Sequence, residues 1–161
     1  MKQSCSILIL VMVTFLFAAQ SFGQKKCDGY LLKNCEPYDK PFKYSGQSKN
    51  ALFELGQKSL LKISVYDGFE YRVSLCSEKS LKGIFFRLRE DNTNRTILYD
   101  SSVEENNYLE KMFYVNSTKN LYIEVVVPEG DVPPEQQSYN ERFGCVGVLL
   151  EYNKRGDVGF E

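Results

Sequence analysis

The sequence predicts an all-β protein, a two-sheet antiparallel β-sandwich of about eight strands in a jelly-roll-like arrangement. Apolar and polar side chains alternate along short segments, and turn residues separate these segments at fairly regular spacing. Alternation with a period of two is required of a strand that has one buried face and one solvated face. No segment carries a helical apolar stripe longer than a turn or two. Two sheets of about four strands each are therefore expected to enclose one core.

The clearest strands are predicted between residues 60 and 90. In the first run, Ile63 and Val65 fall on one face and polar side chains fall on the other. The Asp67-Gly68 pair predicts a turn, and two further alternating runs follow it. Three such runs in succession predict an antiparallel meander. Further strands are predicted over residues 52–55, 96–100, 112–115, 121–127 and 144–152.

Residues 1–23 have the layout of a secretory signal peptide. Lys2 is their only charged residue, an apolar run follows over residues 7–19, and the small residues Ser21 and Gly23 precede the expected cleavage point. The apolar run is shorter than the roughly 20 residues that a membrane-spanning helix needs. We therefore expect a secreted or periplasmic protein with no transmembrane segment after cleavage.

The rest of the chain suits one domain. Residues 24–50 show no steady periodicity and predict an irregular leader held by a disulfide. The β-sandwich domain is predicted over residues 51–152 and a flexible tail over residues 153–161. Within the last strand, Gly147 suggests close approach of another backbone.

Four cysteines remain after the expected cleavage: Cys27, Cys35, Cys76 and Cys145. An even number in an exported chain favours two disulfides, with three connectivities open. Proximity in sequence favours Cys27–Cys35, and the β-type surroundings of the other two favour Cys76–Cys145. A zinc site is disfavoured because the chain has no Cys-x-x-Cys pair and no histidine.

The composition excludes several classes of ligand and of catalytic site. A formal net charge of −1 leaves no electrostatic footprint for nucleic acid. Without histidine, the usual general base and the Ser-His-Asp and Cys-His arrangements are excluded. Glu54, Glu124 and Glu151 lie on predicted outer faces, where solvated acids are expected. The oxygen-rich residues 91–94 lack the Gly and the terminal Glu of an EF-hand, and a turn explains them. We therefore expect no metal, no cofactor and no enzymatic activity.

Two groups of side chains are candidate binding surfaces. Arg72, Arg87 and Arg89 would share an outer face if their strands are neighbours, and planar guanidinium groups bind carboxylates and anionic glycans. The favoured alternative is a sheet face balanced by nearby glutamates, since charges on strands also prevent edge pairing.

The second group is aromatic. Tyr139 and Phe143, in the long connection over residues 128–143, are candidates for stacking on sugars together with Tyr38 and Phe42 of the leader. The alternative is that these rings cover the ends of the sandwich. A connection of this length is usually either functional or disordered.

The region from Phe53 to Val127 resembles the pre-peptidase C-terminal (PPC-like) type of secreted β-sandwich. The matching stretches are "GQKSLLKISVYDGFEYRVSL", "FFRLRED" and "LYIEVVV". The stretches "YRVSLCS" and "GCVGVLLEY" are more similar to exported bacterial proteins without an assigned function. This resemblance implies an accessory, non-catalytic module and supplies no site residues.

The predicted function is that of a secreted, non-catalytic binding or interaction module. Its partner would be an unknown protein or glycan at the cell envelope, and not a nucleic acid. Two alternatives remain open, a small carboxylate-based hydrolase and a purely structural component of the envelope.

Overall fold

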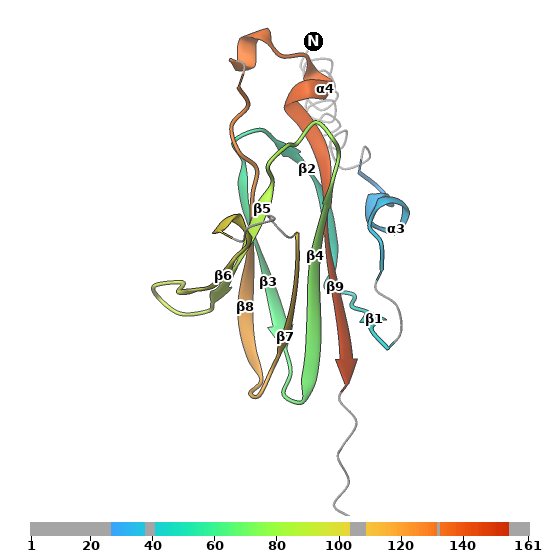
Figure 1. Cartoon of the computed structure of the whole chain (residues 1–161), viewed down its shortest axis with the longest axis vertical. Coiled ribbons are helices and arrows are strands. Elements are labelled where there is room, and N and C mark those ends of the chain that lie inside the picture. The colour runs from blue at the N-terminus through green and yellow to red at the C-terminus, as the bar shows by residue number, and fades with distance from the viewer. Residues whose placement is uncertain (1–26, 38–40, 104–108, 132, 155–161) are drawn as a thin grey trace, which may run out of the picture.

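The structure is a computed structural model that describes residues 27–37, 41–103, 109–131 and 133–154. The predicted signal peptide and most of the predicted tail lie outside these residues. Two antiparallel sheets face each other (Figure 1). Sheet A has the order β1-β9-β4-β7, with β2 also pairing with β9, and sheet B has the order β3-β8-β5-β6. The elements are α3 (Tyr30–Asn34), β1 (Lys43–Tyr44), β2 (Lys49–Glu54), β3 (Lys58–Val65), β4 (Phe69–Ser77), β5 (Phe85–Glu90), β6 (Ile97–Asp100), η2 (Ser101–Val103), β7 (Glu110–Tyr114), β8 (Lys119–Val126), η3 (Pro134–Gln136), α4 (Tyr139–Arg142) and β9 (Phe143–Lys154).

The strand pairings are nested. β2 pairs with β9, β3 with β8, β4 with β7, and β5 with β6. This is one long hairpin of eight strands, with its tip between β5 and β6, rolled so that successive strands pass from one sheet to the other. Such a rolled hairpin is a jelly roll. The predicted fold class is therefore confirmed, and the two-residue strand β1 is an addition at the edge of sheet A.

The predicted meander is wrong. β3 and β5 belong to sheet B, whereas β4 between them belongs to sheet A. The turn at Asp67-Gly68 therefore carries the chain from one sheet to the other, with Gly68 at a φ of 78°. Alternation reports that a strand has one buried face, but it does not report which strand lies beside it.

The core lies between the two sheets. Alternate side chains of each central strand point into it, as the period of two predicts. At the end of β7, Tyr114 faces solvent, and the next residue, Val115, is buried. Val115 therefore lies on the inward face of this segment. The largest fully buried apolar side chains are Ile63, Val65, Val73, Leu81, Phe86, Leu121, Ile123, Val125, Val127, Val146 and Leu150.

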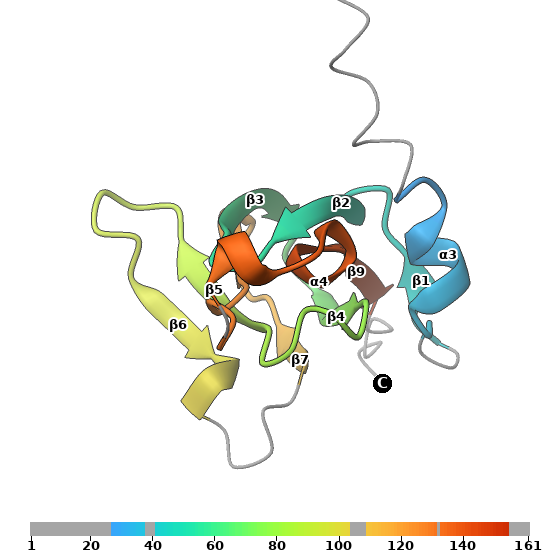
Figure 2. The same cartoon turned by 90° about the horizontal axis from the view of Figure 1, so that it is seen from above.

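The leader contains one short helix, α3, which the sequence did not predict. Gly29, at a φ of 67°, turns the chain into the helix. Leu31 of α3 packs with Leu149 on the outer face of sheet A, beside Cys35 and Cys76. α3 thus covers part of the sheet face that points away from the core (Figures 1 and 2).

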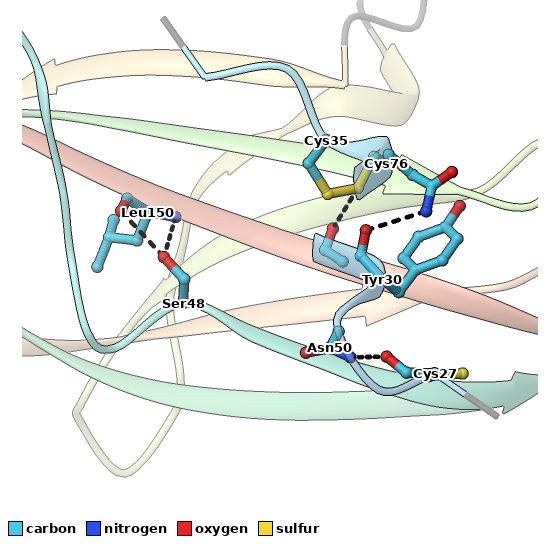
Figure 3. The surroundings of a disulfide bond; sticks show 9 residues. Cys27, Tyr30, Cys35, Ser48, Asn50, Cys76 and Leu150 are labelled. Carbon is cyan, nitrogen blue, oxygen red and sulfur yellow. Dashed lines mark hydrogen bonds between the residues drawn. A yellow bond between two sulfur atoms is a disulfide. The ribbon is translucent and has the colours of Figure 1, made fainter. Parts of the chain in front are cut away.

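The two disulfides join the leader to sheet A. Cys27 is bonded to Cys145 and Cys35 to Cys76, with Cα–Cα distances of 5.5 and 5.4 Å. Figure 3 shows the second bond, together with the side-chain amide of Asn50 donating to the Cys27 carbonyl. The favoured pairing of Cys27 with Cys35 and of Cys76 with Cys145 is therefore wrong.

The register of β4 and β9 explains the error. Cys76 lies opposite Gly147, so Cys145 is a diagonal neighbour of Cys76, two residues away along β9. Diagonal neighbours are roughly 7–8 Å apart, which is farther than a disulfide allows. Each strand cysteine is instead bonded to the leader that crosses above it.

Gly147 lies directly beneath the leader. A Cβ atom at this position would be 2.5 Å from Cys35 Sγ and 2.7 Å from Cys76 Sγ. The sequence predicted the close approach of a backbone here, and the approaching group is a disulfide. We expect Gly147→Ala to lower the free energy of unfolding by about 1–3 kcal/mol through overpacking.

Gly46→Ala is the matched control, because no atom lies within 4 Å of a Cβ at Gly46. Urea unfolding of both variants measures the effect. Equal midpoints would show that the leader does not pack tightly on β9.

Candidate functional site

One end of the sandwich is built from three connections, which we call the loop end: residues 54–57, 78–83 and 128–142. The third connection contains η3 and α4 and folds back over the first (Figures 1 and 2). Leu55 N–H donates to the Arg142 carbonyl and Gly56 N–H donates to the Pro128 carbonyl, both at 3.0 Å. The side chains of Arg142 and Glu54 form an ion pair. Residues 128–142 are thus held at both ends by the turn that follows β2.

A capping box stabilises the first turn of the helix α4. Ser138 N–H and Ser138 Oγ lie 2.8 and 2.7 Å from a Glu141 carboxylate oxygen, as in a capping box. The hydroxyl hydrogen bond from Ser138, followed by its backbone N–H, lowers the pKa of Glu141 below the usual range. This charged carboxylate at the first turn also complements the helix dipole.

Two adjoining hollows, open to solvent, lie on either side of residues 129–131. Their volumes are about 640 and about 610 Å³. The first extends toward Ser80 and Lys82, and the second toward Glu54 and Arg142. The residues that line both are Leu55, Glu129, Gly130, Asp131 and Gln137.

The predicted aromatic candidates are brought together only in part. The Tyr139 and Phe143 rings stack at the loop end, with centroids 4.6 Å apart and an interplanar angle of 26°. Tyr139 is 56% exposed. Tyr38 lies outside the described residues. Phe42 precedes β1, which pairs at Tyr152 near the far end of β9, so it lies away from the other two.

The three predicted arginines do not share a face. Arg72 is on β4 of sheet A, whereas Arg87 and Arg89 are on β5 of sheet B, so they lie on opposite outer faces. The condition for one patch, that the two strands are neighbours, is not met, because the β3–β4 and β4–β5 connections change sheets. Each guanidinium group also has acidic partners, as the alternative held. Those of Arg87 and Arg89 are Asp100 and Glu124, at 2.6–3.3 Å.

Arg72 forms the most buried ion pair among the described residues. Its Nη1 and Nη2 atoms lie 2.5 Å from Glu151 and 2.6 Å from Glu110. The Arg72 and Glu151 side chains are 7% and 2% exposed. Glu151 was expected to be solvated on an outer face. That expectation is wrong, because β1 and β4 flank Glu151 and the Arg72 side chain lies against its carboxylate.

Among the described residues, each carboxyl group whose pKa is clearly shifted has a lowered pKa. The hydrogen bond from Arg72 lowers the pKa of Glu110, and that from Lys62 lowers the pKa of Asp91. Burial raises the pKa values of Asp100 and Glu124, but hydrogen bonds from Ser102 and the arginines outweigh it and lower them. A catalytic acid needs a raised pKa. These carboxylates are therefore suited to structural ion pairs.

The described residues contain no group of three or more metal-ligating side chains. They also contain no helix that is long and apolar enough to cross a membrane.

The fold defines the class of protein as a two-sheet jelly roll. Comparison with known proteins adds little to this. No family model matches the chain, and no curated protein matches it. The resemblance to the PPC-like type therefore stays a prediction.

Two solved structures are similar in outline. One is a periplasmic inhibitor of g-type lysozyme from Aeromonas hydrophila, 6% identical, with a TM-score of 0.46 over 73% of this chain and 93% of the inhibitor. The other is the corresponding inhibitor from Salmonella Typhimurium, 10% identical, with a TM-score of 0.38 over 73% of this chain and 95% of the inhibitor. Likenesses this distant assign neither a family nor a ligand.

Sequence reasoning identified the long connection but missed the residues against which it folds. Leu55 and Ser80 come from connections that carry no motif. Gly130 carries the only readable signal, a glycine inside a proline-rich stretch. A Cβ there would lie 2.9 Å from Leu55 Cδ1 and 2.7 Å from Gln137 Nε2, so glycine permits the close approach that shapes both hollows.

Proposed function

We propose that this chain is an exported, non-catalytic binding module that contacts a protein partner through its loop end. The observation that carries the proposal is the exposed Tyr139, stacked on Phe143, in a connection that is held at both ends and whose Glu141 and Arg142 each line one of the two hollows. An aromatic side chain fixed before binding loses little entropy on association, and such residues are favoured anchors of protein interfaces. The two disulfides are typical of proteins in oxidising compartments and support export.

One feature favours a protein over a sugar as the ligand. The described loop end offers a single exposed aromatic side chain, Tyr139, for stacking. Phe143 covers one face of that ring, which reduces the area on which a sugar would stack. The hollows are open and have the size of ligand pockets, which run to about 300–1,000 Å³. They suit protruding side chains of a partner.

Photo-crosslinking tests the proposal in the full chain. A photoreactive phenylalanine analogue replaces Tyr139, and in a control variant it replaces Tyr66, which is 53% exposed in the turn at the opposite end. Both variants are irradiated with an envelope extract and, separately, with g-type lysozyme, the enzyme named for the two similar structures. We expect a discrete crosslinked protein from position 139 only.

The identified protein is then titrated against Tyr139→Ala and Tyr66→Ala. Tyr139→Ala is expected to weaken binding about tenfold or more, as for an interface anchor, and Tyr66→Ala to leave it unchanged. Equal crosslinking at both positions, or equal affinities, would refute the role of the loop end. Binding to a glycan array in place of a protein would also overturn it. Turnover of a chromogenic substrate that one Asp or Glu substitution abolishes would establish the hydrolase instead.

A further inference from the structure

Sheet B ends at β3, and no other strand of the described residues pairs with its outer edge. β3 pairs with β8 on one side only, in an unbroken antiparallel register. The Val127 N–H donates to the Gln57 carbonyl. In the register between β3 and β8, the backbone N–H and C=O groups of the odd-numbered β3 residues therefore point toward β8. Because the N–H and C=O groups of one residue point to the same edge of a strand, and successive residues alternate between edges, those of Lys58, Leu60, Lys62 and Ser64 face away from β8.

Gln47 confirms this orientation. Its side-chain amide accepts from Ser64 N–H at 2.8 Å and donates to the Ser64 carbonyl at 3.0 Å. These two bonds are those that a neighbouring strand would make with Ser64, so Gln47 occupies the pairing position at one end of the edge. Among the described residues, the N–H and C=O groups of Lys58, Leu60 and Lys62 have no such partner.

The side chains along this edge are basic with one apolar residue between them. Lys58 and Leu60 are exposed, and the Lys62 side chain is 50% exposed beside Asp91. Lys49 adds to the charge from β2, which runs along the same side of the sandwich (Figure 2). Lys49 is in register with the core residue Val148 and is nevertheless exposed, so this side of the sandwich is open.

We propose that the free edge of β3 binds an extended acidic segment of a partner protein as an added strand. Backbone groups of Leu60 would supply the pairing, and the flanking lysines would favour carboxylates two residues to either side. A second copy of this chain is a poorer occupant. In a symmetrical pair centred on Leu60, Lys58 would lie opposite Lys62, and like charges directly opposite each other destabilise a sheet.

The probe is the peptide acetyl-Gly-Glu-Thr-Val-Thr-Glu-Gly-amide, titrated into ¹⁵N-labelled protein. Valine opposite Leu60 places the two glutamates opposite Lys58 and Lys62. We expect the amide signals of Leu60 and Lys62 to shift, and their hydrogen exchange to slow. Binding is expected to weaken as salt is raised. A peptide with lysine in place of both glutamates is expected to bind at least about tenfold more weakly.

Two single hydrogen-bond deletions test the pairing itself. N-methylation of the peptide valine leaves the protein untouched, and Leu60→Pro removes the matching N–H from the protein. Each is expected to weaken binding about tenfold. Proline is tolerated where an edge N–H faces solvent, and Leu60→Ala, which keeps the N–H, is the control.

Binding that is equal for the methylated and unmethylated peptides, equal for the lysine peptide, or absent overturns the proposal. Shifts confined to the loop end do so too. Tyr139→Ala is expected to leave peptide binding unchanged. The proposal for the β3 edge is therefore tested independently of the proposal for the loop end.

Discussion

Replacing Cys27 and Cys145 together by serine is expected to lower the free energy of unfolding by about 5 kcal/mol. The bond spans 118 residues, and cross-links that close long loops restrict the unfolded chain most. It also holds the start of the leader against β9. The second bond, Cys35–Cys76, spans 41 residues, so its double serine variant is expected to lose somewhat less, about 4 kcal/mol.

Urea unfolding followed by tyrosine fluorescence measures both losses, since the chain has 11 tyrosines and no tryptophan. Peptide mapping without reduction checks the connectivity independently. Recovery of a peptide pair linked through Cys27 and Cys35 would contradict the structure. So would a Cys27→Ser/Cys145→Ser variant that is as stable as the parent.

The second large effect is expected at Arg72. Arg72→Met removes the guanidinium group that lies against the carboxylate of Glu151, 2% exposed, and breaking a buried pair in this way costs about 3–5 kcal/mol. Glu110 also loses its partner, but its side chain is 38% exposed and water replaces much of the interaction. The measurement is again urea unfolding at neutral pH.

The double variant Arg72→Met/Glu151→Leu separates the pair from the packing around it. Removing both charges is expected to restore much of the lost stability, because no uncompensated charge remains buried. Lys62→Met is the control, since the Lys62–Asp91 pair is exposed to solvent and is expected to contribute little to stability. If Arg72→Met and Lys62→Met lose equal stability, the Arg72 pair is not buried in solution.

Part of the loop end could be predicted from the sequence. Its length and prolines marked residues 128–143 as a connection of interest, and Tyr139 and Phe143 were candidates. The partners Glu54 and Leu55 were out of reach, because they are more than 70 residues away along the chain and carry no local signal. Whether Phe42 lies near these rings was out of reach for the same reason, since it depends on which end of β9 the leader meets.

The β3 edge illustrates a different limit. Alternation showed that Ile63 faces the core, but it could not show that β3 has only one neighbour. Gln47 is unremarkable in sequence. It acquires a role because the chain between β1 and β2 passes beside Ser64.

The sequence alone determined that this protein is an all-β sandwich, because side-chain alternation is a local property that each strand carries within itself. Only the tertiary structure decided which strands are neighbours, which cysteines are bonded, that Arg72 and Arg87 lie on opposite faces, and that Glu151 is buried. These features depend on where the chain changes sheets and on what the leader covers. Both are contacts between residues far apart in sequence, which no short-range pattern records.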